Sequence, residues 1–263
     1  MMARMLTCLL FLGNLAAQPS AQSWQFVRSF NLEQKITSAD VGTLGKIYLG
    51  TSRGNVYSFL ADGTPDNQFS SAVFQPVTCL DASNQLKVFA FYSAVGKFEF
   101  LDRFSAMQRT YHLADFGVSN AQLAMPSINN FIWFLSGNEL IQVNPLDRMV
   151  LARIGLSGVV LVNPNQLRII PEGFAVSDEQ GLHMFRKSGE LIFSVEAPTL
   201  RGFTVVDRWA RAHASNGIIQ VNVVTSQVAW MSSPRPQANL MLRSGEFYHF
   251  VEDGQVFTYR RSE

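Results

Sequence analysis

Apolar and polar residues alternate along this chain in short runs that are broken by turn-forming residues. Leu86–Tyr92 reads as one strand, and Lys97–Leu101 reads as its neighbour across a turn at Gly96. No window of three or four helical turns shows a 3.6-residue period, so we expect little helix. The pattern therefore predicts an all-β protein built from short strands.

The same hairpin recurs along the chain, each copy centred on a glycine that follows one or two turn-forming residues. Asn-Gly and Asp-Gly are favoured in such turns because both central residues tolerate positive φ. The spacings of the glycines are about 42, 41, 44, 36 and 37 residues, close to the period of a four-stranded propeller blade. The six glycines are Gly54, Gly96, Gly137, Gly181, Gly217 and Gly254.

Each period holds four short strands, which favours a β-propeller over a sandwich. In the second unit we expect strands at 77–81, 86–92, 97–101 and 107–113. In the third unit we expect them at 121–124, 130–135, 139–143 and 149–154. These units predict blades of four antiparallel strands.

The last unit is one strand short, because only 255–259 follows the final glycine. An unassigned strand at 24–30 begins the domain, and pairing it with the last blade would close the ring. We therefore predict a six-bladed β-propeller closed by its N-terminal strand. Two connections are long, 156–165 and 231–237, and extra strands near Val160 would change the blade count by one.

The first residues differ from the rest of the chain. Arg4 precedes an apolar run at 5–12, and small and polar residues follow at 14–22. This order is typical of a secretory signal peptide, although a buried N-terminal helix is an alternative. We expect a signal peptide at 1–21, one propeller domain at 22–263, and export to the periplasm or beyond. No later segment has the ~20 apolar residues of a membrane helix.

Composition limits the partners. The chain is 47% hydrophobic and 16% charged, which is enough to bury a large core. Twenty-one basic residues against twenty acidic ones leave a formal charge of +1. Nucleic acid and anionic membranes demand a basic surplus, so neither is expected as a main partner.

Residues with catalytic chemistry are scattered. The four histidines, His112, His183, His213 and His249, show no metal-ligand spacing. No nucleophile elbow, metalloprotease helix or phosphate-binding loop is present. Cys79 lies in an apolar strand-like context and is interpreted as a buried small hydrophobe. The sequence thus assigns no catalytic residue, no metal ligand and no cofactor.

Three aspartates, Asp40, Asp81 and Asp207, occupy matching places just after expected inner strands. Such positions lie on one face of a propeller near its channel, so these residues are the candidate binding residues for a cation or a polar ligand. The alternative is that each aspartate caps a tight turn with its own side chain.

The segments Pro76–Tyr92, Phe98–Asp102 and Asn130–Leu135 carry a family resemblance. They resemble uncharacterised exported six-bladed β-propeller proteins of the Bacteroidota, over essentially the mature chain. The resemblance implies the fold and brings no catalytic residues. More loosely, the blades are similar to quinoprotein-like and WD- or YVTN-type propellers. Only four tryptophans are present, and the blades number fewer than the eight usual in quinoproteins, so no quinone cofactor is expected.

The leading functional hypothesis is a non-catalytic interaction scaffold of the cell envelope. It would bind a protein partner, as a monomer or within a hetero-complex. One alternative is a hydrolase or lyase that needs a divalent cation and is similar to gluconolactonases. A third is sugar or peptide binding at the channel mouth. The sequence leaves open whether the protein is an enzyme.

Overall fold

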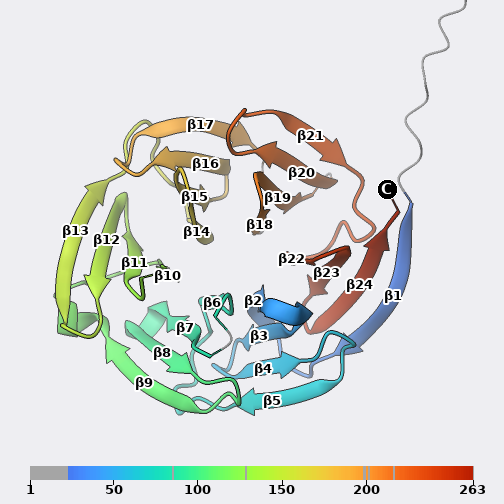
Figure 1. Cartoon of the computed structure of the whole chain (residues 1–263), viewed down its shortest axis with the longest axis horizontal. Coiled ribbons are helices and arrows are strands. Elements are labelled where there is room, and N and C mark those ends of the chain that lie inside the picture. Colours follow the sequence, from blue (N-terminus) through green and yellow to red (C-terminus); the bar gives the residue numbers. More distant parts are fainter. Residues whose placement is uncertain are drawn as a thin grey trace, which may run out of the picture.

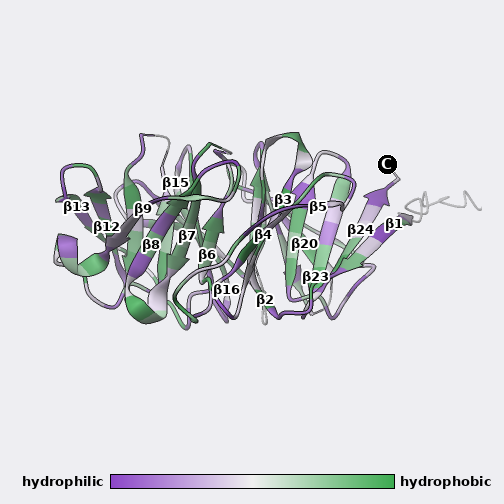
Figure 2. Cartoon of the chain, turned by 90° about the horizontal axis from the view of Figure 1, so that it is seen from below, coloured by the Kyte–Doolittle hydropathy of each residue, from purple (hydrophilic) through white to green (hydrophobic). Residues whose placement is uncertain are grey.

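The computed structural model describes residues 23–84, 86–127, 129–197, 200, 202–215 and 217–262. The strands of this part form six antiparallel sheets of four strands each, arranged as blades around a central axis (Figure 1). Seen edge-on, the ring is a flat disc whose strands run from one face to the other (Figure 2). The prediction of a six-bladed propeller is confirmed.

The first three blades follow one another along the chain. Blade 1 contains β2 (Ile36–Val41), β3 (Ile47–Thr51), β4 (Val56–Phe59) and β5 (Pro65–Phe69). Blade 2 contains β6 (Cys79–Asp81), β7 (Val88–Tyr92), β8 (Lys97–Leu101) and β9 (Met107–His112). Blade 3 contains β10 (Leu123–Pro126), β11 (Ile132–Ser136), β12 (Glu139–Asn144) and β13 (Met149–Gly155).

The other three blades complete the ring. Blade 4 contains β14 (Gln166–Ile170), β15 (Gly173–Ser177), β16 (Gly181–Arg186) and β17 (Leu191–Glu196). Blade 5 contains β18 (Phe203–Val206), β19 (Trp209–Ala214), β20 (Gly217–Asn222) and β21 (Val228–Met231). Blade 6 contains β22 (Leu240–Ser244), β23 (Phe247–Glu252), β24 (Gln255–Arg261) and β1 (Trp24–Asn31). Short 3-10 turns occur at η1 (Thr43–Gly45), η2 (Ser93–Val95) and η3 (Leu113–Phe116).

Middle strands of the blades are apolar on both faces because each blade is covered by a neighbour on either side. Successive side chains of a strand point to opposite faces. In β11, Trp133 packs towards Phe174 of blade 4, whereas Phe134 packs towards Phe91 and Phe98 of blade 2. The core therefore consists of the layers between blades rather than of one central cluster.

The six glycine hairpins all lie between the second and third strands of their blades, as the repeat predicted. Gly54 shows why a glycine is needed there. Its φ is +84°, and a Cβ would lie 2.4 Å from the carbonyl oxygen of Val73. Any larger residue would combine a strained backbone with a backbone clash.

The N-terminal strand closes the ring. β1 pairs antiparallel with β24, with Trp24 opposite Arg261 and Asn31 opposite Gln255. A bulge interrupts the register between Phe26 and Arg28. This confirms the predicted closure, which leaves no open seam between the chain ends (Figure 1).

The long connection at 156–165 adds no blade. Its strand-like contact is a single bridge between Ser157 and Glu190. Asn138 holds the connection by donating its side-chain amide to the carbonyl oxygens of Leu156 and Val159. The expected signal peptide at 1–21 lies outside the described residues.

Candidate functional site: a charged floor in the propeller channel

The structure places two of the three candidate aspartates together in the channel. Asp40 lies within β2, one residue before its end, and Asp81 is the last residue of β6. Both line one large cavity at the channel mouth. Asp207 lies in the exposed turn between β18 and β19, with a φ of +57°, and does not line that cavity. Asp40 and Asp81 thus form a pair without Asp207.

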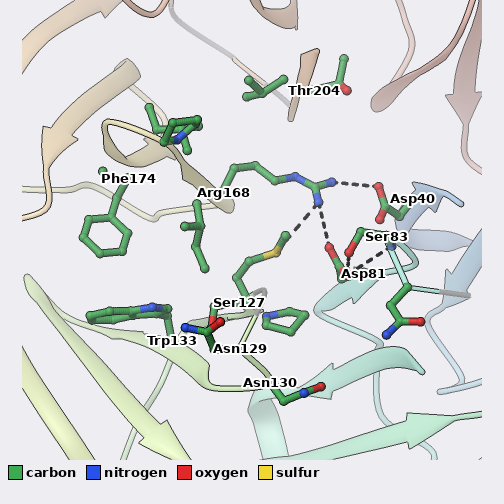
Figure 3. Close-up of a pocket in the computed structure, with 18 of the residues that line it drawn as sticks. Asp40, Asp81, Ser83, Ser127, Asn129, Asn130, Trp133, Arg168, Phe174 and Thr204 are labelled. Carbon is green, nitrogen blue, oxygen red and sulfur yellow. Dashed lines mark hydrogen bonds and ion pairs between the residues drawn. The ribbon is translucent and has the colours of Figure 1, made fainter. Parts of the chain in front are cut away.

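Arg168 of β14 joins the two aspartates from across the ring. Its Nη2 lies 3.1 Å from Asp40 Oδ1, and its Nη1 lies 3.5 Å from Asp81 Oδ2 (Figure 3). The three side chains come from blades 4, 1 and 2. They are largely shielded from solvent, with exposed fractions of 14%, 13% and 3% for Arg168, Asp40 and Asp81.

Backbone groups fix the two carboxylates in place. Asp40 Oδ2 accepts a 2.8 Å hydrogen bond from the amide of Ala82. Asp81 Oδ1 accepts bonds from the amide and hydroxyl of Ser83, at 3.3 and 2.7 Å. Asp81 therefore does cap its own turn, which is the alternative to ligand binding that the sequence left open. Its Oδ2, however, is buried and accepts no hydrogen bond from the described residues.

The pKa of Asp81 in this cluster is unusually high for an aspartate. Burial, and next the charge of Asp40, raise the pKa of Asp81 from the usual 3.8 to about 6, despite Arg168 and the bonds from Ser83. Burial by itself lowers the pKa of the Arg168 guanidinium, but Asp40 and Asp81 raise it by more, so Arg168 stays protonated. Above pH 6 the cluster carries two negative charges and one positive charge.

The cluster is the floor of a cavity of about 1110 Å³. Its walls come from all six blades. Among the described residues, its charged lining consists of Lys87, Arg168, Lys187 and Arg243 against Asp40 and Asp81, or four positive charges against two negative ones. Uncharged polar lining residues are Ser83, Asn84, Ser127, Asn129, Asn130, Gln142 and Thr204.

A second cavity, of about 300 Å³, lies beyond the floor in the channel. Arg168, Met125 and Leu242 line both cavities and so separate them. Cys79 lines the smaller one, where its Sγ accepts a bond from the amide of Ala124. Desolvation raises the pKa of the Cys79 thiol to about 11, so the thiolate is disfavoured. The residue is partly buried and packs with apolar neighbours, whereas the sequence predicted full burial.

No histidine is among the described residues that line either cavity. His112 is exposed on an outer strand, and the other three are buried in blades 4, 5 and 6. His183 illustrates their structural use: its Nε2 lies 2.9 Å from Asp178 Oδ1, and its Nδ1 lies 2.9 Å from Ser194 Oγ. Asp178 in turn accepts backbone bonds that hold the hairpin of blade 4.

Two further features are absent from the described part of the chain. Within the described ranges, no three His, Cys, Asp or Glu side chains are grouped closely enough to hold a metal ion. In the same part of the chain, no helix has the length and apolar character needed to cross a membrane.

Fold and site together define a six-bladed β-propeller with a charged floor across its channel. Solved structures with the same fold include virginiamycin B lyase from Staphylococcus aureus, in a catalytically inactive form with quinupristin. It is 16% identical with a TM-score of 0.63, over 88% of this chain and 82% of that one. A selenomethionine form of that lyase is 15% identical with a TM-score of 0.61, over the same shares of the two chains.

A third solved structure is the extracellular domain of a proposed one-component system from B. thetaiotaomicron. It is 12% identical with a TM-score of 0.57, over 86% of this chain and 32% of that one. No family model matches the sequence. No curated protein matches it either. At these identities the similarity shows the propeller fold alone.

Sequence reasoning missed Arg168, the residue that organises the floor. It lies in β14, 128 residues away from Asp40 in the chain. One signal was present: a lone arginine within the apolar strand Gln166–Ile170 is out of place unless a buried partner receives it. That signal indicates a buried charge, but it does not indicate which residue is the partner.

Proposed function

We propose that this protein binds a small polar organic ligand in the large cavity, with the floor of Arg168, Asp40 and Asp81 as the recognition element. The observation that carries the proposal is the Oδ2 of Asp81, which is buried and accepts no hydrogen bond from the described residues, although Arg168 Nη1 lies 3.5 Å away. Buried ion pairs seldom add stability over apolar residues of the same size, so the fold by itself gains little from this cluster. A ligand hydroxyl or ammonium group would supply the missing donor.

The walls narrow the ligand class further. Lys87, Lys187 and Arg243 give the walls three positive charges, which favour a ligand that also carries negative charge. The serine, threonine and amide side chains suit hydroxyl groups. The volume of about 1110 Å³ is slightly above the range of about 300–1,000 Å³ that small-molecule sites span. We therefore propose a hydroxylated organic acid, such as an acidic monosaccharide.

Isothermal titration calorimetry with glucuronate, glucose and glucosamine tests this proposal. Glucuronate should bind most tightly, because it offers both hydroxyl donors and a carboxylate. Asp81→Asn should weaken it by about tenfold, the loss of one charge-assisted hydrogen bond of ~1.4 kcal/mol or more. Glu139→Gln, an exposed change at the other end of blade 3, is the matched control. No binding of any of the three sugars, or equal binding by Asp81→Asn, contradicts the proposal.

We further propose that the protein is exported, with a signal peptide at 1–21 and a single propeller at 22–263, and that it does not catalyse a reaction. The residue order at 1–22 supports export. The similar fold of an extracellular domain from B. thetaiotaomicron is compatible with export. N-terminal sequencing after expression of the full chain tests it: an intact Met1 on the accumulated protein contradicts export. A melting shift in calcium or magnesium would instead favour the cation-dependent hydrolase or lyase.

A protein-binding scaffold of the cell envelope is the second candidate, and exposed apolar loop residues favour it. Leu44 is 92% exposed, and Phe104, Leu86 and Leu146 are each more than 60% exposed, all in loops on the cavity side of the ring. A pull-down from envelope extract should then lose its partner on Leu44→Ser with Phe104→Ser. An unchanged partner set contradicts docking on this face.

A further inference from the structure

Three arginines converge between blades 5 and 6, away from the channel floor. They are Arg211 of β19, Arg243 of β22 and Arg261 of β24. Tyr248 of β23 lies in their midst: Arg243 is directly opposite it in the sheet, with the guanidinium 5.5 Å from the centre of its ring. Arg261 lies two residues beyond Tyr259, which is opposite Tyr248 on the other side.

Strand geometry directs Arg211 into the same space. Along β19, Ala210 and Ala212 pack against blade 4. Arg211 and His213 therefore point the other way, and the His213 ring lies 5.9 Å from that of Phe250 in blade 6. The charges of Arg243 and Arg261 act on Arg211, whose pKa is lowered first by burial and then by these two neighbours. Three positive charges thus share one inter-blade layer.

No carboxylate of the described residues forms an ion pair with the cluster. Among the described residues, the ion pairs of the molecule join other basic side chains, and none includes Arg211, Arg243 or Arg261. Asp207 is the acidic residue whose charge reaches Arg211, and it lies in an exposed turn. By contrast, the nearby Arg260 is paired with Glu246 at 3.0 Å.

Two donors of the cluster are also without acceptors in the described structure. Arg211 Nη1 and Arg261 Nε are buried and make no hydrogen bond. The remaining bonds are local: Arg211 Nε donates to Gln220 Oε1 at 2.9 Å, and Arg243 Nε donates to the Gly245 carbonyl at 3.0 Å. Each of the three arginines is partly exposed to solvent.

We propose that this cluster, Arg211, Arg243 and Arg261, binds a tetrahedral oxyanion, as inorganic phosphate or sulfate or as the corresponding ester group of a larger ligand. Guanidinium forks match the geometry of such oxygens, and one bound dianion would offset the mutual repulsion and accept from the orphaned donors. Arg243 also lines the large cavity, so the site lies beside its wall. The proposal does not rest on ligand binding in that cavity.

Thermal unfolding in phosphate, sulfate and chloride at matched ionic strength tests the site. With 10 mM phosphate or sulfate, the melting temperature of the wild-type protein should rise by about 2–4 °C over chloride. The anion that gives the larger rise distinguishes a phosphate site from a sulfate site. Equal melting temperatures of the wild-type protein in phosphate, sulfate and chloride overturn the proposal.

Variants locate the effect. Arg211→Gln and Arg243→Gln should each abolish the rise, whereas Arg153→Gln on blade 3 should retain it. A rise that persists in both arginine variants overturns the proposal. If Arg211→Gln does not fold, Arg211→Lys keeps the charge without the fork and should reduce the rise. Broadening of the phosphate ³¹P resonance by wild-type protein, absent with Arg243→Gln, is the second measurement, and equal broadening by both proteins counts against the site.

Discussion

The positive charge of arginine is neutralised in one buried cluster of this propeller and not in the other. In the channel, one guanidinium serves two carboxylates, and the surplus charge is negative above pH 6. Between blades 5 and 6, three guanidiniums share one layer without a carboxylate partner among the described residues. The floor is thus satisfied mainly from within the chain, whereas the inter-blade cluster is not. The difference teaches that one ring can neutralise a buried guanidinium with carboxylates in its channel and leave others without such partners between two of its blades.

Removing the central arginine should have the largest effect. Arg168→Gln leaves Asp40 and Asp81 buried without a cation, so the free energy of unfolding should fall by about 3–5 kcal/mol at pH 7.5. Urea unfolding measures the loss. Arg153→Gln breaks an exposed pair with Glu139 and should cost no more than about 1 kcal/mol. Equal losses for the two variants would show that the buried ion pairs of Arg168 contribute no more to stability than the exposed pair of Arg153 and Glu139.

The second effect is a pH dependence that belongs to Asp81. Its folded-state pKa, about 6, lies above the unfolded value, so the folded state binds more protons between about pH 4 and 6. Its contribution to stability is complete below that window and is lost as pH rises through 6. The loss is on the order of 2–3 kcal/mol, at ~1.4 kcal/mol per pH unit. Unfolding curves from pH 4 to 7 should be flatter for Asp81→Asn, and an unchanged slope contradicts the assignment.

A combined variant tests whether the three charges of the floor act as one unit, because it removes all of them. Arg168→Met with Asp40→Asn and Asp81→Asn removes every charge there together. The triple variant should lie within about 2 kcal/mol of wild type, far less than the sum of the single losses. Urea unfolding of the singles and the triple gives the coupling. Additive losses would mean that the three side chains do not act as one unit.

The smallest effect concerns the inter-blade cluster in chloride. Raising the salt from about 0.02 to 0.5 M should screen its repulsion and stabilise the wild-type protein by under about 1 kcal/mol. Arg211→Gln should gain less from salt than wild type does. Arg153→Gln is the control. The same gain in Arg211→Gln as in wild type would mean that the arginines of this cluster do not repel one another measurably.

The strands and the repeat were predictable because they depend on local chemistry. Val88–Tyr92 is apolar at every position, and the turn at Gly54 needs positive φ. Such features can be recognised in one stretch of sequence. The ring closure followed from counting, since one blade lacked a strand and one strand lacked a blade. Asp40 and Asp81 were found by the same repeat, because equivalent positions in neighbouring blades lie side by side around the channel.

The partners of those aspartates were beyond the repeat. Asp207 occupies a similar position in the sequence, yet it lies in an exposed turn. Arg168 has no counterpart at the matching place of the other blades, so periodicity could not identify it. Arg211, Arg243 and Arg261 come from three strands and two blades, and none of them stands out in its own segment.

By itself, the sequence determined the strand period, the hairpin turns and the number of blades. Each of these depends on residues a few positions apart. Only the tertiary structure decided which charged side chains meet. Opposite blades face each other across a narrow channel, and adjacent blades share a buried layer. Residues more than a hundred positions apart in the chain, such as Asp40 and Arg168, are therefore brought within 3.1 Å of each other. Charge interacts through space, and so its pattern is a property of the ring rather than of any one blade.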